Sequence, residues 1–385
     1  MSIPIAKPYF DEYEKQAVSE VLESGWVSQG PKCEEFERAV RRFVGAKHAV
    51  ATNSGTSAIH LALIASEVGP GDEVICPAFT CVAMLHPIEH LGAKPVLVDI
   101  ELEAFGLDVS LLADAMTSRT RAVMAAHLFG LAANMEEIAR SASDHGISMV
   151  EDAALGLGAT LGNKNAGSFG DVSCLSFHPR KMITTGEGGM ILTDSEEIAR
   201  RAAELRNYGA TASAWTRHEG NLFDLADYKE AGFNYKLTDI QAAIGLVQIK
   251  KLTEILRKRC AIARRYDEAF ADLDWLILPR EPEGRRHAYQ SYVCMVSVGS
   301  AGDTGSVSSV RRKLWSHLAG DGIASVQGAQ AMPTVAYYHE KYGWEPRDFP
   351  AALRADVASV ALPIFPGLTE DEQDRVIRSV QAFRP

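Results

Sequence analysis

The sequence has no run of 18 apolar residues, and its first residues show no basic start followed by an apolar stretch. We therefore expect neither a membrane span nor a secretory signal. Basic residues are also in deficit, because 39 Lys and Arg face 50 Asp and Glu, which gives a formal net charge of −11. This balance argues against nucleic acid or an anionic membrane as the main partner. It leaves room for a small anionic substrate, because a local pocket can oppose the sign of the whole chain.

Cysteine pairs and metal motifs are missing as well. None of the six cysteines forms a CxxC pair and several lie in apolar runs, a pattern typical of reduced core thiols in a cytoplasmic protein. The eleven histidines show no tight metal-ligand spacing, and the sequence contains neither an HExxH motif nor a GxxxxGKS/T loop. We therefore expect no metal site.

An alternation of apolar strands and helices is present from His48 to Asn207. The expected strands are His48–Thr52, Glu73–Cys76, Pro95–Val98, Ala122–Ala126, Ser148–Glu151, Val172–Phe177 and Met190–Thr193, and the expected helices are Gly55–Val68, Thr80–Leu91, Ser110–Met116, Asn134–His145 and Ser195–Asn207. Such alternation predicts a parallel sheet with helices on both faces.

The flanking segments complete the predicted organisation. We expect helices at Phe10–Glu23 and Lys32–Val44, a long surface loop at Tyr208–Gly232, a long or broken helix from Thr238 to Leu273, a strand at Tyr292–Val298, and helices at Ser306–Ala319 and Thr369–Ala382. The composition changes beyond Trp275. A chain of this length can form two domains, so we predict a large domain over 1–274 and a smaller α+β domain over 275–385.

Lys181 is the main candidate for catalysis. The apolar run Val172–Phe177 must stop near Pro179, which has no N–H to donate to a ladder, so Lys181 lies just past a strand end. Ligands bind at such ends in α/β sheets. A lysine there has its pKa lowered by desolvation and can form a Schiff base with the aldehyde of pyridoxal phosphate (PLP). The alternative is an ordinary solvated surface lysine.

Three further stretches bear on this hypothesis. Asn53–Ser57 joins a strand to a helix, where free N–H groups can bind phosphate or where the stretch is a simple helix cap. Asp152 ends a buried strand, where it can hold the pyridine nitrogen of PLP protonated or cap the next turn. Asn234 is an amide donor that could reach a phosphate, and it precedes Thr238 and Asp239, either of which can cap the following helix.

A glycine-rich segment imitates a dinucleotide site. Gly156–Gly162 has glycines spaced as in a nicotinamide-binding fingerprint. The following residues, Asn163–Gly170, are polar and do not form the amphipathic helix that a true fingerprint opens. We therefore reject nicotinamide binding.

Taken with these stretches, the sequence resembles the DegT/DnrJ/StrS aminotransferase family. The resemblance is carried by SGWVSQGPKCEEFE, TNSGTSAIHLAL, PAFTCVA, HLFG at His127–Gly130, VEDAALGLGA, SFHPRKMITTGEGGM, LRNYGA, FNYKLTDIQAAIGL and LPIFPGLTEDEQ, in this order. It implies a fold type I PLP enzyme similar to aspartate aminotransferase. Such an enzyme has an α/β large domain with a mixed, mostly parallel sheet covered by helices, and a smaller C-terminal α+β domain.

The resemblance also implies roles for individual residues. Lys181 matches the Schiff-base lysine, and Asp152 matches the aspartate that faces the pyridine nitrogen. The backbone of Gly55 and Thr56 and the hydroxyl of Ser176 match the phosphate cradle. Asn234 matches an asparagine that, in dimers of the family, reaches the cofactor phosphate of the neighbouring subunit. The resemblance therefore implies a homodimer with shared active sites.

Two positions depart from the family pattern. Cys81 stands where an aromatic residue often stacks on the cofactor ring, and Leu155 stands where Gln or His usually lies near the ring oxygen. Both changes make the expected surroundings of the ring less polar and less stacked. They affect the expected cofactor affinity and substrate subclass, but not the reaction type. A related dehydratase branch carries His in place of Lys181, so the lysine argues against that branch.

We therefore predict a ping-pong transamination from L-glutamate to a keto sugar, in the first place a nucleotide-linked 3- or 4-keto-deoxyhexose. Lys181 would act as general base and acid. His178, Arg180 and Trp26 are the candidate substrate contacts. The alternatives are a cyclitol or amino-shikimate-type aminotransferase, and a catalytically silent regulatory protein with this fold.

Overall fold

The computed structural model describes residues 2–212, 215, 227–299 and 303–385, and most of the predicted loop 208–232 lies outside these ranges. In the described part of the chain, the largest sheet has seven strands in the order β1-β10-β9-β6-β5-β2-β4. These strands are β1 (His48–Thr52), β2 (Glu73–Pro77), β4 (Lys94–Val98), β5 (Thr120–Ala126), β6 (Ser148–Asp152), β9 (Val172–Ser176) and β10 (Gly189–Thr193). Each predicted strand is present, with ends within about two residues.

The sheet is mixed, because β10 is antiparallel to both β1 and β9, whereas the pairs from β9 to β4 are parallel. The alternation of strands and helices alone predicted a parallel sheet. A parallel connection needs a crossover, usually through a helix. Residues 177–188, which join β9 to β10, contain no helix, so the chain folds back and reverses direction.

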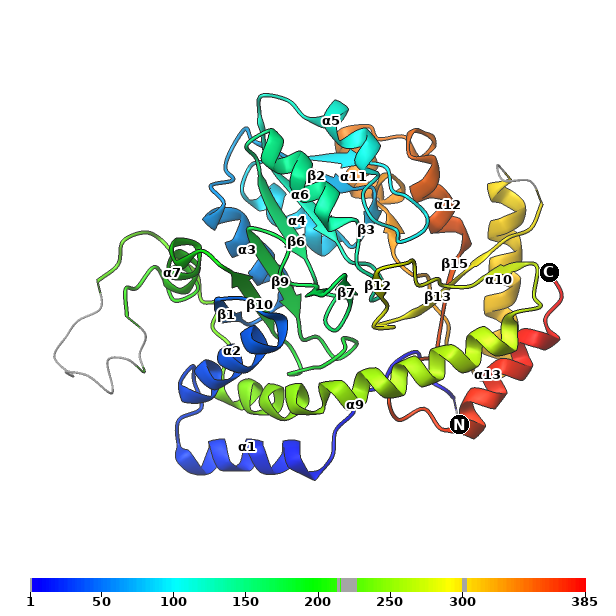
Figure 1. Cartoon of the computed structure of the whole chain (residues 1–385), viewed down its shortest axis with the longest axis horizontal. Coiled ribbons are helices and arrows are strands. Elements are labelled where there is room, and N and C mark those ends of the chain that lie inside the picture. Colours follow the sequence, from blue (N-terminus) through cyan, green and yellow to red (C-terminus); the bar gives the residue numbers. More distant parts are fainter. Residues whose placement is uncertain (1, 213–214, 216–226, 300–302) are drawn as a thin grey trace.

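Helices cover both faces of this sheet (Figure 1). The side chains of β5 show the division, because Ala122 and Met124 belong to one buried cluster and Val123 and Ala125 to another. The first face is covered by α3 (Gly55–Ala65), α4 (Val82–His90) and α7 (Glu196–Leu205), and the second by α2 (Pro31–Val44), α5 (Leu112–Ala115), α6 (Met135–Asp144) and α9 (Asp239–Phe270).

The C-terminal third builds a smaller sheet of β11 (Leu276–Ile277), β13 (Tyr292–Val296) and β15 (Ser359–Leu362). The elements around it are α10 (Thr304–Gly320), α11 (Ala336–Tyr342), α12 (Pro350–Ala358), α13 (Glu370–Ala382), η2 (Met332–Thr334) and η3 (Pro346–Asp348). The sequence pattern predicted a loop rich in Gly, Pro and Tyr between residue 324 and the last helix, and this is wrong, because the segment contains α11, α12 and β15. Helices α11 and α12 are short, and β15 depends on pairing with the distant β13.

Two short ladders join this third to the rest of the molecule. β14 (Gln330–Ala331) pairs with β3 (Phe79–Thr80), and β12 (Arg285–Arg286) pairs with β7 (Thr160–Leu161), which also pairs with β8 (Lys164–Asn165). Because β7 pairs with β8, the glycines of the segment that imitates a dinucleotide site lead into a β-hairpin and not into a helix.

A 3-10 turn, η1 (Val109–Leu111), precedes α5.

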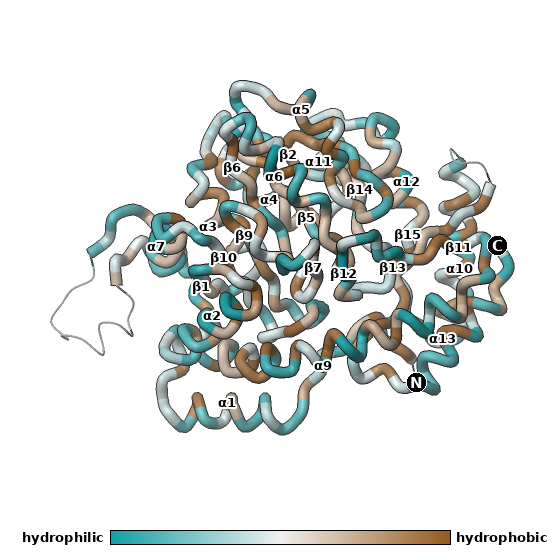
Figure 2. Tube along the Cα trace, in the orientation of Figure 1, coloured by the Kyte–Doolittle hydropathy of each residue, from teal (hydrophilic) through white to brown (hydrophobic). Residues whose placement is uncertain are grey.

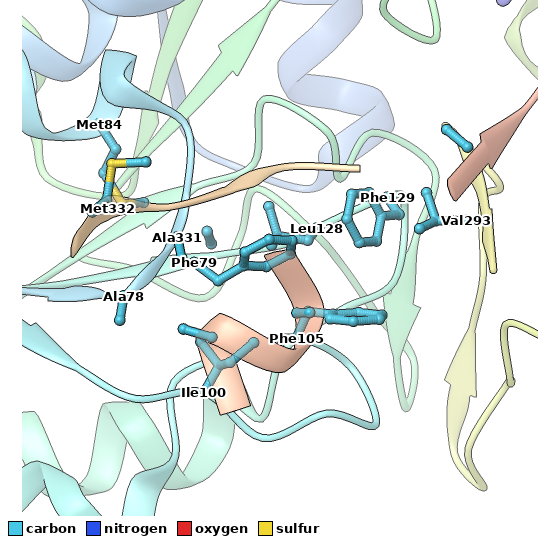
Figure 3. Packing of buried hydrophobic residues seen from close by; sticks show 14 of the residues in the cluster. Ala78, Phe79, Met84, Ile100, Phe105, Leu128, Phe129, Val293, Ala331 and Met332 are labelled. Atoms are coloured by element: carbon cyan, nitrogen blue, oxygen red, sulfur yellow. The ribbon is translucent and has the colours of Figure 1, made fainter. Parts of the chain in front are cut away.

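Apolar packing is continuous across residue 274. Figure 3 shows Phe79, Phe105 and Phe129 beside Val293 and Ala331, and all of them belong to one buried cluster. The three phenylalanine rings are 5.1–6.4 Å apart between centroids. The division of the chain at residue 274 remains a prediction.

Helix α9 connects the distant parts of the molecule, as Figure 1 shows, and apolar and polar residues alternate along it (Figure 2). Thr238 is its N-cap, whereas Asp239 accepts the backbone N–H groups of Gly30, Lys32 and Cys33 at the start of α2. Of the two predicted caps, Thr238 is therefore the one that caps α9.

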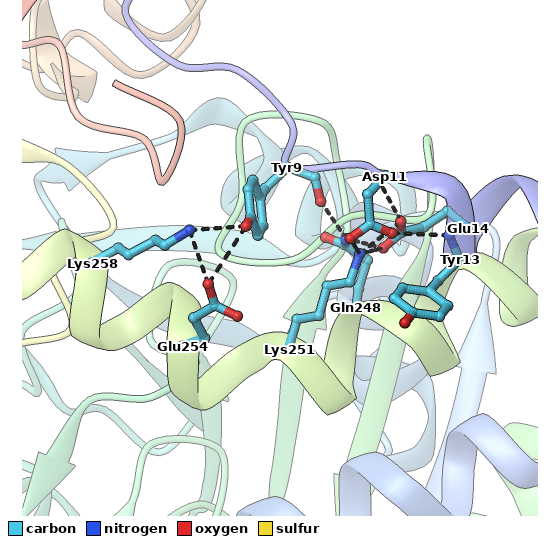
Figure 4. Close-up of polar contacts among 8 residues, drawn as sticks. All are labelled: Tyr9, Asp11, Tyr13, Glu14, Gln248, Lys251, Glu254 and Lys258. Atoms are coloured by element: carbon cyan, nitrogen blue, oxygen red, sulfur yellow. Dashed lines mark hydrogen bonds and ion pairs between the residues drawn. The ribbon is translucent and has the colours of Figure 1, made fainter. Parts of the chain in front are cut away.

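Helix α1 (Glu12–Ser24) packs on α9 through charged groups (Figure 4). Lys251 forms ion pairs of 2.8 Å with both Asp11 and Glu14. Lys258 donates a hydrogen bond to the hydroxyl of Tyr9 at 2.8 Å. Within the described ranges, no helix has both the length and the apolar character needed to cross a membrane.

Candidate active site

A cavity of about 590 Å³ lies at the carboxyl ends of β6 and β9. This is where open α/β sheets bind ligands. Nine residues that we selected from the sequence line it: Gly55, Thr56, Cys81, Asp152, Leu155, Ser176, His178, Arg180 and Lys181. Its volume is within the range of small-molecule sites.

The start of α3 forms one wall of the cavity. Ser54 is the N-cap and accepts the backbone N–H of Ser57 at 3.0 Å, so the capping alternative is correct. The N–H groups of Gly55 and Thr56 come in the first turn, where they have no partner within the helix and where the helix dipole favours an anion. The helix start is therefore capped and also suited to bind an anion through its free N–H groups.

Ser176 faces this helix start from the end of β9. A Cβ added at Gly55 would come within 2.8 Å of the Ser176 Cβ and 3.2 Å of its Oγ. Only glycine lets the helix N-terminus approach the hydroxyl this closely. Backbone N–H groups and a hydroxyl on one small concave surface fit a phosphate group.

Lys181 lies in the turn that follows β9, and its backbone N–H donates to the carbonyl of His178 at 2.9 Å. Burial lowers the pKa of the Lys181 amine, and the nearby Asp152 carboxylate partly opposes this effect. A lowered pKa increases the fraction of neutral amine, which is the nucleophilic form. Lys181 also lines the cavity and is only partly exposed, which argues against an ordinary solvated surface lysine.

Asp152 ends β6 and lines the same cavity. Its Oδ1 accepts the N–H of Ala154 at 2.9 Å, as the capping alternative predicted. Burial raises the pKa of Asp152, whereas the Ala154 N–H and the Lys181 charge act to lower it. A cationic ring nitrogen would stabilise the ionised carboxylate further, so the position suits the pyridine nitrogen of PLP.

Glu151, the neighbouring carboxylate, points away from the cavity and is completely buried. It accepts hydrogen bonds from His127 Nε2, Ser173 Oγ and three backbone N–H groups. Burial acts to raise its pKa, but the hydrogen bonds from His127 and Ser173 overcome this and lower it. Alternation along β6 thus gives the two adjacent carboxylates different environments.

His127 is a cavity residue that we had noted only as part of a motif. The N–H of Ala133 donates to its Nδ1 at 3.1 Å, so Nε2 carries the proton that is donated to Glu151 at 2.7 Å. A Cβ on Gly156 would lie 3.0 Å from the His127 ring. The glycine that imitated a dinucleotide fingerprint therefore leaves room for this histidine.

Cys81 and Leu155 line the cavity, as expected, and make its wall less polar. Arg180 also lines it and is exposed. His178 lies 4.0 Å from Glu187, measured between Nε2 and Oε1. The guanidinium of Arg180 forms no ion pair with any carboxylate in the described ranges, so it is available to an anionic ligand.

Two predicted site residues lie elsewhere. Asn234 is exposed and its carbonyl accepts a hydrogen bond from Asn53 Nδ2 at 3.5 Å, but it does not line the cavity of its own chain. Trp26 is also outside this cavity, because its indole donates to the carbonyl of Gln29 and packs against Trp215. Neither residue can act in the site of its own chain as placed here.

Other cavity residues were missed because they come from distant segments. They include Ile5 and Ala6 near the N-terminus and Gln290, Gln327 and Ile364 in the C-terminal third. Of these, only Ile364 belongs to a motif that we had noted, LPIFPGLTEDEQ. Only the pairing of β13 with β15 and of β14 with β3 brings the C-terminal members here.

A family model described as the DegT/DnrJ/EryC1/StrS aminotransferase family matches residues 8–381. The chain belongs to this family. It is 37% identical over 380 residues to "Spore coat polysaccharide biosynthesis protein SpsC" of Bacillus subtilis (strain 168), with 98% of this chain and 96% of that protein covered.

Solved structures agree with this assignment. The PLP-form of the putative sugar aminotransferase Spr1654 from Streptococcus pneumoniae has a TM-score of 0.90 at 29% identity and covers 100% of both chains. The Helicobacter pylori aminotransferase PseC, described as involved in pseudoaminic acid biosynthesis, has a TM-score of 0.90 at 26% identity, with 99% and 98% covered. The protein is therefore a PLP-dependent aminotransferase of fold type I, as the sequence predicted.

The contact between Gly55 and Ser176 generates a prediction. Gly55→Ala would force its Cβ against Ser176 and close the proposed phosphate cradle. We expect PLP affinity to fall by about 10–100-fold, which corresponds to about 1.4–2.8 kcal/mol. The dissociation constant can be measured by fluorescence titration of apoenzyme with PLP.

Gly69→Ala is the matched control, because an added Cβ there meets nothing within 4 Å. It should leave PLP affinity unchanged. Equal affinities of the two variants would contradict the cradle.

Proposed function

We propose that this aminotransferase moves the amino group of L-glutamate to a nucleotide-linked keto sugar, of the 3- or 4-keto-deoxyhexose class, in amino-sugar biosynthesis. The observation that carries the proposal is the Arg180 guanidinium, which lines the cavity that holds Lys181 and Asp152 and forms no ion pair with a carboxylate in the described ranges. Support also comes from relatives that are described as acting in spore coat polysaccharide and pseudoaminic acid biosynthesis.

In this proposal each residue has a defined task. PLP, when bound, supplies a reactive aldehyde and a ring that accepts electrons. Gly55, Thr56 and Ser176 hold its phosphate. Asp152 keeps the ring nitrogen protonated by offering it a carboxylate. Lys181, whose pKa is lowered by burial, removes the proton from the Cα of the amino donor and delivers it to the cofactor carbon next to the ring.

Arg180 suits the anionic part of the acceptor. Guanidinium binds phosphate through two parallel hydrogen bonds, and each charge-assisted hydrogen bond contributes about 1.5–3 kcal/mol. His178 lies beside it on the cavity wall. A free keto sugar or keto cyclitol lacks the diphosphate, so it gains nothing from this contact.

We also propose that the active unit is a homodimer in which Asn234 binds the cofactor phosphate of the neighbouring subunit. Asn234 is exposed, lies outside the cavity of its own chain and is next to Asn53. Phe233 and Tyr235, stacked with ring centroids 4.9 Å apart, flank it. Trp26 lies outside the cavity of its own chain and stays a proposed substrate contact.

Of the two alternatives, the silent regulatory protein is wrong, because the chain belongs to a family of PLP-dependent aminotransferases. A cyclitol or amino-shikimate-type substrate remains the competing proposal. The cytoplasmic location also stays a prediction from the cysteines.

The proposal first predicts the position of the covalent attachment. Borohydride reduction of the yellow holoenzyme, followed by peptide mass mapping, should place the cofactor on Lys181. Lys181→Ala should lose transamination by at least about 10²–10⁴-fold. Lys164→Ala, at an exposed lysine of β8, is the control and should behave as wild type. A tag on any other side chain would overturn the assignment.

The role of Arg180 gives a second prediction. Arg180→Ala should raise KM for a nucleotide-linked keto sugar by about 10–100-fold, because a charge-assisted contact is lost. Glutamate should still bleach the cofactor band at the wild-type rate. Stopped-flow absorbance measures the glutamate half-reaction, and coupled release of 2-oxoglutarate measures the full cycle.

The same assay separates the candidate substrates. Nucleotide-linked keto sugars, free keto sugars and a keto cyclitol are compared with both enzymes. If wild type prefers the cyclitol, or if Arg180→Ala affects free and nucleotide-linked sugars equally, the diphosphate contact is refuted.

The shared site gives a third prediction. Lys181→Ala and Asn234→Asp should each be nearly inactive as homodimers, the second because it sets a carboxylate against phosphate. After mixed refolding, half of the dimers are mixed, and each mixed dimer has one intact site if Asn234 crosses over. About a quarter of wild-type activity should then return. No recovery in a mixture shown by mass spectrometry to contain mixed dimers would exclude the crossover.

A further inference from the structure

Gln290 is a buried cavity residue with no role so far. It lies just before β13, is 6% exposed and lines the same cavity as Lys181. Its backbone packs closely against Gly130, because a Cβ added at Gly130 would come within 2.6 Å of the backbone nitrogen of Gln290. Gln290 belongs to the C-terminal third, whereas Lys181 belongs to the central sheet.

The side-chain amide joins these two parts. Gln290 Nε2 donates to the backbone carbonyl of Arg180 at 2.6 Å, and Arg180 directly precedes Lys181. A carbonyl oxygen can only accept, so this contact fixes which end of the amide faces the turn. Gln290 is thereby hydrogen-bonded to the backbone that carries the lysine.

The backbone of Gln290 is held from the opposite side. Arg259 on α9 donates from one guanidinium nitrogen to the carbonyls of Tyr289, Gln290 and Ile364, at 3.1–3.2 Å. Arg259 is buried and, in the described part of the chain, forms no ion pair with a carboxylate. A continuous path therefore runs from α9 through Arg259 and Gln290 to the turn of Lys181.

This arrangement leaves unmet hydrogen-bonding groups. Gln290 Oε1 and Arg259 Nε are both buried, and neither has a hydrogen-bond partner in the described ranges. A buried polar atom without a partner costs about 1–3 kcal/mol. Most native buried groups avoid this cost, so its presence at a cavity calls for a functional explanation. The side-chain amide of Gln290 thus donates from Nε2 to the Arg180 carbonyl, while its Oε1 has no hydrogen-bond partner in the described ranges.

We propose that Gln290 is a positioning residue that holds the turn of Lys181, so that the amine stays buried opposite Asp152. The inference rests on the proposed role of Lys181 as the lysine that attaches PLP. The charged and titratable groups that act on this amine are Asp152 from β6, Cys81 before α4 and Arg180 in its own turn. Release of the turn moves the amine relative to all three and admits water.

The sign of the effect follows from burial. Burial lowers the pKa of Lys181, so a released and better hydrated amine has a higher pKa. At a given pH below that value, a smaller fraction of the amine is neutral. Attack on the PLP aldehyde therefore becomes slower, and its pH dependence moves upward.

Gln290→Met, of nearly equal size but without a donor, tests the proposal. Apoenzyme is mixed with PLP at a series of pH values, and the rise of the visible band gives the rate of covalent attachment. We expect this rate at neutral pH to fall by about tenfold and the midpoint of its pH profile to rise. This readout involves neither sugar nor turnover.

Gln373→Met is the matched control. Gln373 is also buried, at 4% exposure, and its Nε2 donates to the carbonyl of Ile262 at 2.8 Å, but it does not line the cavity. It should lose similar stability and keep the wild-type rate and pH midpoint. If Gln290→Met matches this control in both, the positioning role is overturned.

A second variant covers the case in which Gln290→Met does not fold. Gln290→Glu keeps the size and has a donor only when protonated, so attachment should be slow at neutral pH and recover relative to wild type at acid pH. Wild-type behaviour at all pH values would refute the proposal. If the cofactor attaches to Lys181 and neither variant has an effect, only the positioning role of Gln290 is refuted. If the cofactor attaches to another residue, the proposed role of Lys181 is refuted.

Discussion

The site depends on one electrostatic arrangement, an amine and a carboxylate that share a cavity at the ends of neighbouring strands. Lys181 and Asp152 are each removed from much of the bulk water. Burial lowers the pKa of Lys181 and raises the pKa of Asp152, so it favours the neutral form of both groups. Their mutual attraction opposes both shifts. The amine therefore loses its proton more easily than that of an ordinary lysine, which favours attack on a carbonyl and proton transfer.

The fold produces this arrangement by reversing one strand. Because no helix separates β9 from β10, the segment between them is a loop at the carboxyl end of the sheet, and Lys181 lies in it. The same edge receives the start of α3, which brings helix N–H groups toward Ser176. Pro179 ends the strand before Lys181, and Gly55 lets the start of α3 approach Ser176. These two residues therefore help to set the position of the amine relative to the proposed anion site.

Local signals in the sequence were sufficient for these parts. Proline after an apolar run, a small-residue helix start and a carboxylate at a strand end identified Lys181, Gly55 and Asp152, and the structure brings all three to one cavity. Each signal works because it concerns backbone geometry within a few residues. The capping alternatives were also correct, since Ser54 and Asp152 make their local hydrogen bonds.

Pairing between distant segments was not available to the same reasoning. The strand β15 and the ladders β12–β7 and β14–β3 depend on partners far along the chain, so periodicity could not indicate them. Gln290 enters the cavity for the same reason. A lone glutamine or histidine in an apolar context has no local signature, and its function appears only when the tertiary structure shows which carbonyl or carboxylate it meets.

The two carboxylates at the end of β6 have different environments although they are adjacent in the sequence. Glu151 is surrounded by donors that keep it ionised in the absence of water, and it fixes His127 and the backbone around residues 167–170. Asp152 has fewer donors, and burial raises its pKa. In the role proposed for it, a cationic ring nitrogen would stabilise the ionised carboxylate, so cofactor binding would couple the stability of this edge of the sheet to its occupancy.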